Sequence, residues 1–115
     1  MLHREQKSIY WKEIVNGGGK AQFHTCDVSD QKQVQKIVAE IAKKSQINIL
    51  VNNAGIAHVG NIEGTETADM DRLFQVNIKG VYNGMRAVIP FMKDKGGVIL
   101  NMASVASSVG ISDRF

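Results

Sequence analysis

The stretch that decides the fold is INILVNNAG, residues 47–55. Its first five residues are almost entirely apolar, over a length typical of a strand that is buried on both faces of a parallel sheet. Two asparagines, Ala54 and Gly55 follow, where such a strand should end. We therefore expect a central strand at 47–53 that opens into a loop of small and polar residues.

The chain before this strand predicts a helix, a strand and a second helix. Residues 5–15 have a helical pattern, and the glycines of NGGG (16–19) end it. A phosphate-binding loop needs glycines between a strand and a helix, so that interpretation of the triple glycine is rejected. KAQFHTC (20–26) predicts a short strand, and Ser29 or Asp30 can cap a helix that begins near Gln31. Apolar residues recur along one face of that helix at Val34, Ile37, Val38, Ile41 and Ala42.

The chain after the central strand predicts one long helix and a last strand. We expect the helix to begin at a Thr67 cap, to run to about residue 93 and to kink near Pro90. Its apolar stripe comprises Met70, Leu73, Phe74, Val81, Met85, Val88, Ile89 and Met92. VILNM (98–102) predicts the last strand. Alternating helices and strands of this kind predict an α/β fold, a parallel sheet with helices on its faces.

Composition excludes several classes of protein. The 115 residues form one domain or part of one, and a net charge of +3 without a long basic run gives nucleic-acid binding little support. The single cysteine, Cys26, excludes an internal disulfide and is better interpreted as a small buried side chain than as a reactive thiol. No apolar stretch has transmembrane length and MLHREQKS is not a signal peptide, so we expect a cytoplasmic protein without a membrane partner.

Polar and small residues follow each predicted strand, at the edge where open α/β sheets bind ligands. They are Asp27 and Val28, then Asn52, Asn53, Ala54 and Gly55, and finally Asn101, Ala103 and Ser104. Ala54 and Gly55 would let a flat ring approach the backbone, and Asp27 could accept a hydrogen bond from an amine. An ordinary turn explains Asp27 or NNAG equally well when each is taken alone.

Asn77 lies in the middle of the predicted apolar stripe of the long helix. A buried amide without partners costs about 1–3 kcal/mol, and Gly80 and Gly84 on the next turns weaken the helix further. Two interpretations remain open. Asn77 is either a satisfied core amide beside closely packed glycines, or an amide whose carbonyl faces a cleft and orders water.

Four motifs together resemble the central part of a short-chain dehydrogenase/reductase. They are CDVSD (26–30), ILVNNAG (49–55), VNIKG (76–80) and VILNMAS (98–104), in the family's order and at similar spacing. The resemblance implies a partial Rossmann-type, doubly wound parallel sheet, and it makes residues 1–115 a fragment of a single NAD(P)-binding domain. It also implies NAD or NADP as cofactor, with no metal.

The resemblance assigns roles to individual residues. It places Asp27 and Val28 at the adenine and Asn53, Ala54 and Gly55 at the adenosine ribose. Asn77 matches the asparagine that holds a water in a proton relay. Ser104 matches the serine that hydrogen-bonds the reacting oxygen, with Ser107 and Ser108 in the loop on the substrate side.

The implied activity is interconversion of a secondary alcohol and a ketone, on a small molecule such as a sugar, sugar acid or hydroxy acid. The family's glycine-rich turn does not occur in this sequence, and neither does its tyrosine-x-x-x-lysine, since neither Tyr10 nor Tyr82 has a lysine at that spacing. The alternative is a non-catalytic module for dinucleotide binding or assembly. We also expect a homo-oligomer, dimer or tetramer, formed through the 67–93 helix, and poor folding of the isolated 115 residues.

Overall fold

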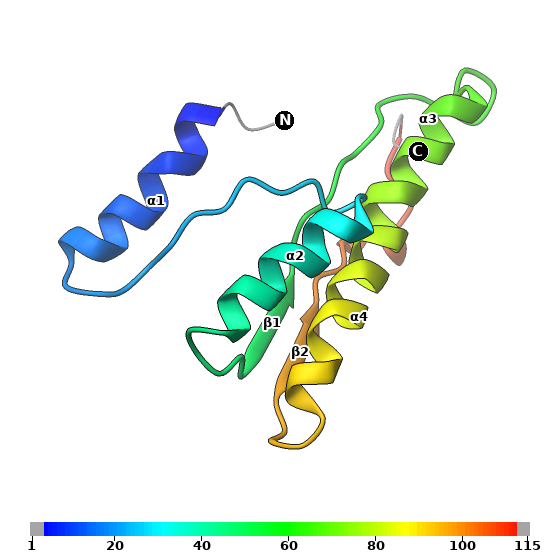
Figure 1. Ribbon diagram of the computed structural model, residues 1–115. Coiled ribbons are helices and arrows are strands. Elements are labelled where there is room, and N and C mark those ends of the chain that lie inside the picture. Colours follow the sequence, from blue (N-terminus) through cyan, green and yellow to red (C-terminus); the bar gives the residue numbers. More distant parts are fainter. Residues whose placement is uncertain (1–3, 113–115) are drawn as a thin grey trace.

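The computed structural model describes the backbone of residues 4–112 and the side chains of residues 10–112 (Figure 1). Helix α1 (Arg4–Asn16) confirms the first predicted helix and stands apart from the other elements. The glycines end it as expected. The N–H groups of Gly18 and Gly19 donate to the carbonyls of Val15 and Ile14, and Gly18 adopts a φ of 86°.

The strand predicted at 20–26 is wrong. This segment runs from α1 to α2 as an unpaired connection, and strand pairing in the described residues is confined to β1 and β2. A strand exists only where a neighbour accepts and donates its backbone hydrogen bonds, and no strand of the described residues 4–112 lies beside residues 20–26.

Helix α2 (Gln31–Ala42) begins where the sequence predicted. Asp30 is its N-cap, because a carboxylate oxygen accepts hydrogen bonds from the N–H groups of Lys32 and Gln33 at 2.9 and 3.2 Å. Val34 is buried on the face that meets α4.

The sheet has two parallel strands, β1 (Ile49–Asn52) and β2 (Val98–Asn101), paired in register from Ile49 with Val98 to Asn52 with Asn101. Helices α2 and α4 lie in front of both strands in Figure 1. Only that face is covered, since Leu50 and Ile99 are half-buried whereas Val51 and Leu100 are exposed. The expectation that the central strand is buried on both faces is therefore wrong for the described part of the chain.

The predicted long helix comprises three consecutive segments. They are α3 (Thr67–Phe74), the π-helical turn η1 (Gln75–Lys79) and α4 (Gly80–Met92), which continues through Pro90. Thr67 is the first helical residue rather than the cap, and Glu66 occupies the cap position without a side-chain hydrogen bond. A π turn inserts an extra residue, so it rotates the following helix by about 100° relative to a straight α-helix.

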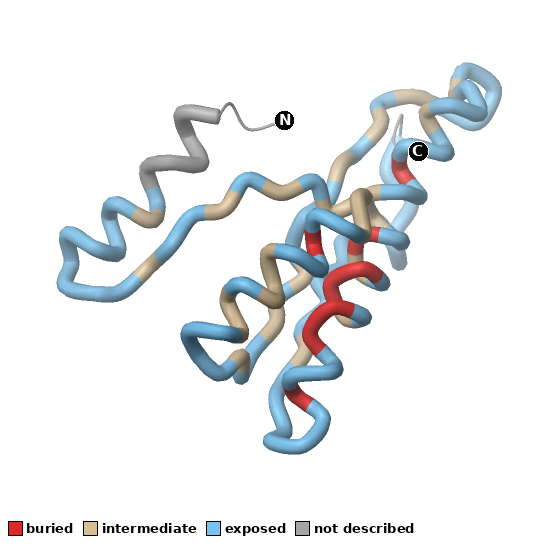
Figure 2. The backbone as a smooth tube through the Cα atoms, in the orientation of Figure 1, coloured by how far each residue is buried: buried red, intermediate tan, exposed pale blue. Residues whose placement is uncertain are grey.

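The buried face of α4 matches the predicted stripe only in part. The core residues cluster on α4 (Figure 2) and are Gly80, Asn83, Gly84, Ala87, Val88 and Met92. Of the predicted stripe, Leu73, Val88 and Met92 are buried. Val81 and Met85 are half-buried, and Met70, Phe74 and Ile89 are exposed. After β2, a single 3-10 turn, η2 (Val105–Ser107), follows. Within residues 4–112, no helix is long and apolar enough to cross a membrane.

Candidate functional site

The carboxyl ends of β1 and β2 lie side by side, as the predicted ligand site requires. Asn52 and Asn101 end the two strands in register, and the Asn52 side chain donates to the Asn101 side-chain oxygen at 2.8 Å. This bond joins the two strand ends from which the NNAG and NMAS loops leave.

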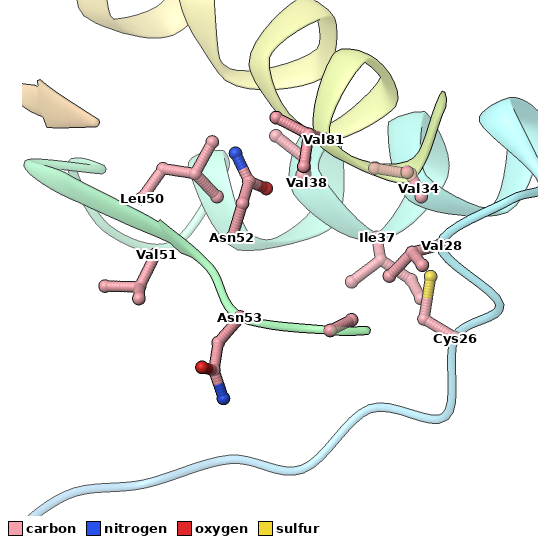
Figure 3. A pocket seen from close by; sticks show the side chains of 13 residues that line it. Cys26, Val28, Val34, Ile37, Val38, Leu50, Val51, Asn52, Asn53 and Val81 are labelled. Atoms are coloured by element: carbon pink, nitrogen blue, oxygen red, sulfur yellow. The ribbon is translucent and has the colours of Figure 1, made fainter. Parts of the chain in front are cut away.

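A hollow of about 190 Å³ lies between β1, α2 and α4 (Figure 3). Val28 and Ala54 both line it, so the structure brings together two segments that are distant in sequence. Its other lining residues are mostly apolar: Cys26, Val34, Ile37, Val38, Leu50, Val51, Asn52, Asn53, Gly80, Val81 and Gly84. Figure 3 shows the Asn52 side chain on the helix side of β1 and the Asn53 side chain pointing the other way.

Asp27 is an exposed residue in a tight turn before α2. Its Oδ1 accepts hydrogen bonds from the Ser29 N–H at 2.9 Å and the Ser29 hydroxyl at 2.7 Å. The Gln33 side-chain oxygen accepts from the Asp27 N–H at 3.2 Å. The ordinary-turn interpretation is therefore correct for Oδ1, while Oδ2 takes no part in these bonds.

Val28 is held by α4. A Cβ on Gly80 would lie 2.9 Å from Val28 Cγ2, so only glycine allows the helix to pack this closely. The Val28 carbonyl accepts a hydrogen bond from Asn83 Nδ2 at 2.9 Å.

Cys26 has the environment of an unreactive thiol. Partial burial raises its pKa, and the Asp27 and Asp30 carboxylates raise it further. The thiol is thus kept protonated, which agrees with its interpretation as a packing residue.

Asn77 lies in η1 and binds the loop that follows β1. Its Oδ1 accepts from the Ile56 N–H and its Nδ2 donates to the Ile56 carbonyl, both at 2.9 Å. Both polar groups of the amide therefore have partners. In the described structure the side-chain carbonyl accepts from the Ile56 backbone and does not face an open cleft. Gly55 lies next to it, since a Cβ there would be 3.6 Å from Asn77 Oδ1.

Ser104 lies at the N-cap of η2 in the exposed loop after β2. Its Oγ accepts from the Ala106 N–H at 3.2 Å, and its carbonyl accepts from the Ser107 hydroxyl at 2.7 Å. These described bonds are local, and none of them joins Ser104 to Asn77.

Asn83, which the sequence did not single out, binds one of the predicted site segments. It is fully buried and hydrogen-bonds the turn that contains Val28 and Ser29. The available signal was its place between Gly80 and Gly84, because a polar residue beside two helix glycines indicates a close polar contact.

A family model described as short chain dehydrogenase matches residues 2–114. The chain belongs to the short-chain dehydrogenase family. It is 35% identical over 111 residues to the 3-oxoacyl-acyl-carrier-protein reductase FabG of Thermotoga maritima, a match that covers 95% of this chain and 45% of that protein. It is 38% identical over 100 residues to the cyclopentanol dehydrogenase of Comamonas sp., covering 85% of this chain and 40% of that protein.

Solved structures agree with this membership. A metagenomic short-chain oxidoreductase in complex with NADP superposes with a TM-score of 0.85 at 33% identity, over 96% of this chain and 51% of that one. The fold is therefore a partial Rossmann-type α/β fold, as predicted. This short-chain dehydrogenase chain spans about half the length of the relatives it matches.

Proposed function

We propose that this chain forms part of an NAD(P)-dependent oxidoreductase that interconverts a secondary alcohol and a ketone. The observation that carries the proposal is the hollow lined by both Val28 and Ala54, the two segments that the family resemblance assigns to the adenosine of the cofactor. Family membership and the NADP in the similar solved structure support the same cofactor class. We further propose that residues 1–115 belong to one NAD(P)-binding domain, and that it is cytoplasmic because its single cysteine forms no internal disulfide.

The described residues fit an adenosine group. Asp27 is exposed, and its Oδ2 is left to accept from an exocyclic amine. Gly55 has no positive φ, and a Cβ there would make only an ordinary contact with Asn77. The described packing does not require glycine at this position, and we propose that a ligand approaches the backbone closely there.

Ser104 and Asn77 have different proposed roles. When bound, the nicotinamide supplies or accepts the hydride. Because Ser104 Oγ accepts from Ala106, its proton is available to donate to the reacting substrate oxygen. Asn77 fixes the loop after β1 through Ile56, and we propose that this positions the proton relay near the cofactor. We place the general acid outside these 115 residues.

The experiment that tests the proposal uses the complete gene product and a panel of secondary alcohols, including cyclopentanol, with the matching ketones. Nicotinamide absorbance should change with at least one pair, and Ser104→Ala should lower turnover about a hundredfold or more. Ser45→Ala is the control, because Ser45 is an exposed serine in the turn after α2. Unchanged turnover in Ser104→Ala would contradict the role of Ser104. Cofactor binding without turnover of any pair would favour the non-catalytic module instead.

We also propose that two copies of the protein associate through α3 and α4. Exposed apolar side chains lie at Phe74, Ile78 and Tyr82, four residues apart from α3 through η1 into α4, and again at Ile89. An unpaired apolar helix face of this kind is typical of an interaction surface.

A further inference from the structure

Asn83 is the most deeply buried polar residue among the described residues, at 0% exposure. Its side chain makes three hydrogen bonds, all to one short segment that lies more than fifty positions earlier in the chain. Nδ2 donates to the carbonyls of Val28 and Ser29 at 2.9 and 3.3 Å, and Oδ1 accepts from Gln31 Nε2 at 3.2 Å.

Core packing alone does not explain this residue. An apolar side chain of similar size would fill the same space without having an amide to satisfy. The neighbouring glycine adds a second constraint, because Gly80 lets Val28 lie against the helix backbone. Together, Asn83 and Gly80 form a surface on α4 that fits the 28–31 segment in both shape and hydrogen bonding.

The same segment orients Asp27. Ser29 accepts from Asn83 through its carbonyl and donates to Asp27 Oδ1 through both its N–H and its hydroxyl. A shift of Ser29 would therefore move the Asp27 carboxylate. The Asp30 cap fixes one end of the turn to α2. The contacts with α4 then determine the orientation of the turn.

We propose that Asn83 is a positioning residue for the adenosine half of the cofactor. It holds the Asp27–Ser29 turn on α4, so that the carboxylate and the Val28 backbone face the adenine. This inference rests on the proposed cofactor use, and it goes beyond that use by assigning a role to a residue that cannot itself touch the ligand.

The test is equilibrium binding to the complete gene product of the two halves of the cofactor, 5′-AMP and nicotinamide mononucleotide, by titration calorimetry. Asn83→Leu removes all three hydrogen bonds to the 28–31 segment and should weaken the binding of 5′-AMP about tenfold. It should leave the binding of nicotinamide mononucleotide unchanged. Val88→Ala is the matched control, since Val88 is buried on the same helix without a hydrogen bond to the turn. It should lower thermal stability and leave the affinity for both halves unchanged.

Gln31→Met provides a second variant that keeps the fold testable, because Gln31 is only half-buried and its loss removes one bond to Asn83. This variant should weaken the affinity for 5′-AMP about threefold and leave the affinity for nicotinamide mononucleotide unchanged. Unchanged 5′-AMP affinity in both variants, or equal losses for the two halves, would overturn the role of Asn83. If the wild-type protein binds neither half, it is the proposed cofactor use that fails.

Discussion

Three asparagine side chains join segments that are far apart in the sequence. Asn52 links the two strands, Asn77 links the helix to the loop at Ile56, and Asn83 links the helix to the turn before α2. A side-chain amide both donates and accepts, so it can pair with a backbone group or with another amide. The sequence identified Asn77, because it interrupts a stripe of apolar residues. It did not identify the partners, which depend on how the elements pack.

Gly84 is required by packing against the end of β1. A Cβ at this position would collide with Asn52 Oδ1, and Asn52 cannot easily move because its amide is bonded to Asn101. Gly84→Ala should therefore destabilise the complete gene product by about 1–3 kcal/mol in urea unfolding. Gly110→Ala is the control, since a Cβ there meets no atom within 4 Å, and it should change stability by less than about 0.5 kcal/mol. Equal stability of the two variants would contradict this prediction, because it would show that the Asn52 side chain moves away from the added Cβ without lowering the free energy of unfolding.

The Asp30 cap makes the start of α2 sensitive to acid. Hydrogen bonds from the backbone N–H of Gln33, above all, hold the pKa of the carboxyl below its usual value. Because the folded pKa is lower than the unfolded one, the cap contributes stability above about pH 3.9, and this stability is lost as the pH falls through the folded pKa. The amide resonances of Lys32 and Gln33 should shift in this acid range.

Asp30→Asn is the matched variant for this prediction, since asparagine caps helices about as well as aspartate but does not titrate. The two resonances should stay constant over the same pH range in that protein. An identical acid shift in both proteins would mean that another group titrates near α2.

Among the helices and strands, the sequence correctly predicted those that depend on the local pattern of apolar and capping residues. The helix at α2, its cap and the two paired strands follow from apolar periodicity and from one side chain before the helix. The strand at 20–26 failed because a strand needs a neighbour, which a local pattern cannot supply. The stripe on α4 was partly right, since Val88 and Met92 are buried but Ile89 is exposed. A π turn at Gln75–Lys79 changes the helical phase, and no residue type marks such a turn.

The proposed association through α3 and α4 has a direct test. Ile78 is 57% exposed in the middle of the apolar face, so Ile78→Lys would place a charge at the centre of the interface on both copies. We expect the dissociation constant of the dimer to rise more than about tenfold in sedimentation velocity experiments. Ile62→Lys is the control, because Ile62 is 74% exposed in the loop before α3, and it should leave association unchanged. A dimer that survives Ile78→Lys would place the interface elsewhere.

The 115-residue chain is less compact than a typical domain of this length. Its radius of gyration is 16.4 Å, whereas a compact domain of this length has a radius of about 13 Å. Helix α1 stands away from the sheet, and one face of both strands is uncovered (Figures 1 and 2). Among residues 10–112, the buried apolar side chains are Val34, Leu73, Ala87, Val88 and Met92.

A core of this size does not offset the chain entropy of 115 residues, since each ordered residue costs about 1–2 kcal/mol in its backbone alone. The 115 residues expressed alone should therefore unfold without a cooperative thermal transition and should self-associate through the uncovered faces of β1 and β2. Circular dichroism melting and sedimentation velocity measure the two properties, and the complete gene product provides the comparison. Val51→Lys, on the uncovered face, should reduce association of the isolated chain, whereas Val88→Lys, in the core, should not. A sharp melting transition with monomeric sedimentation would show instead that α2, α4 and two strands are a sufficient folding unit.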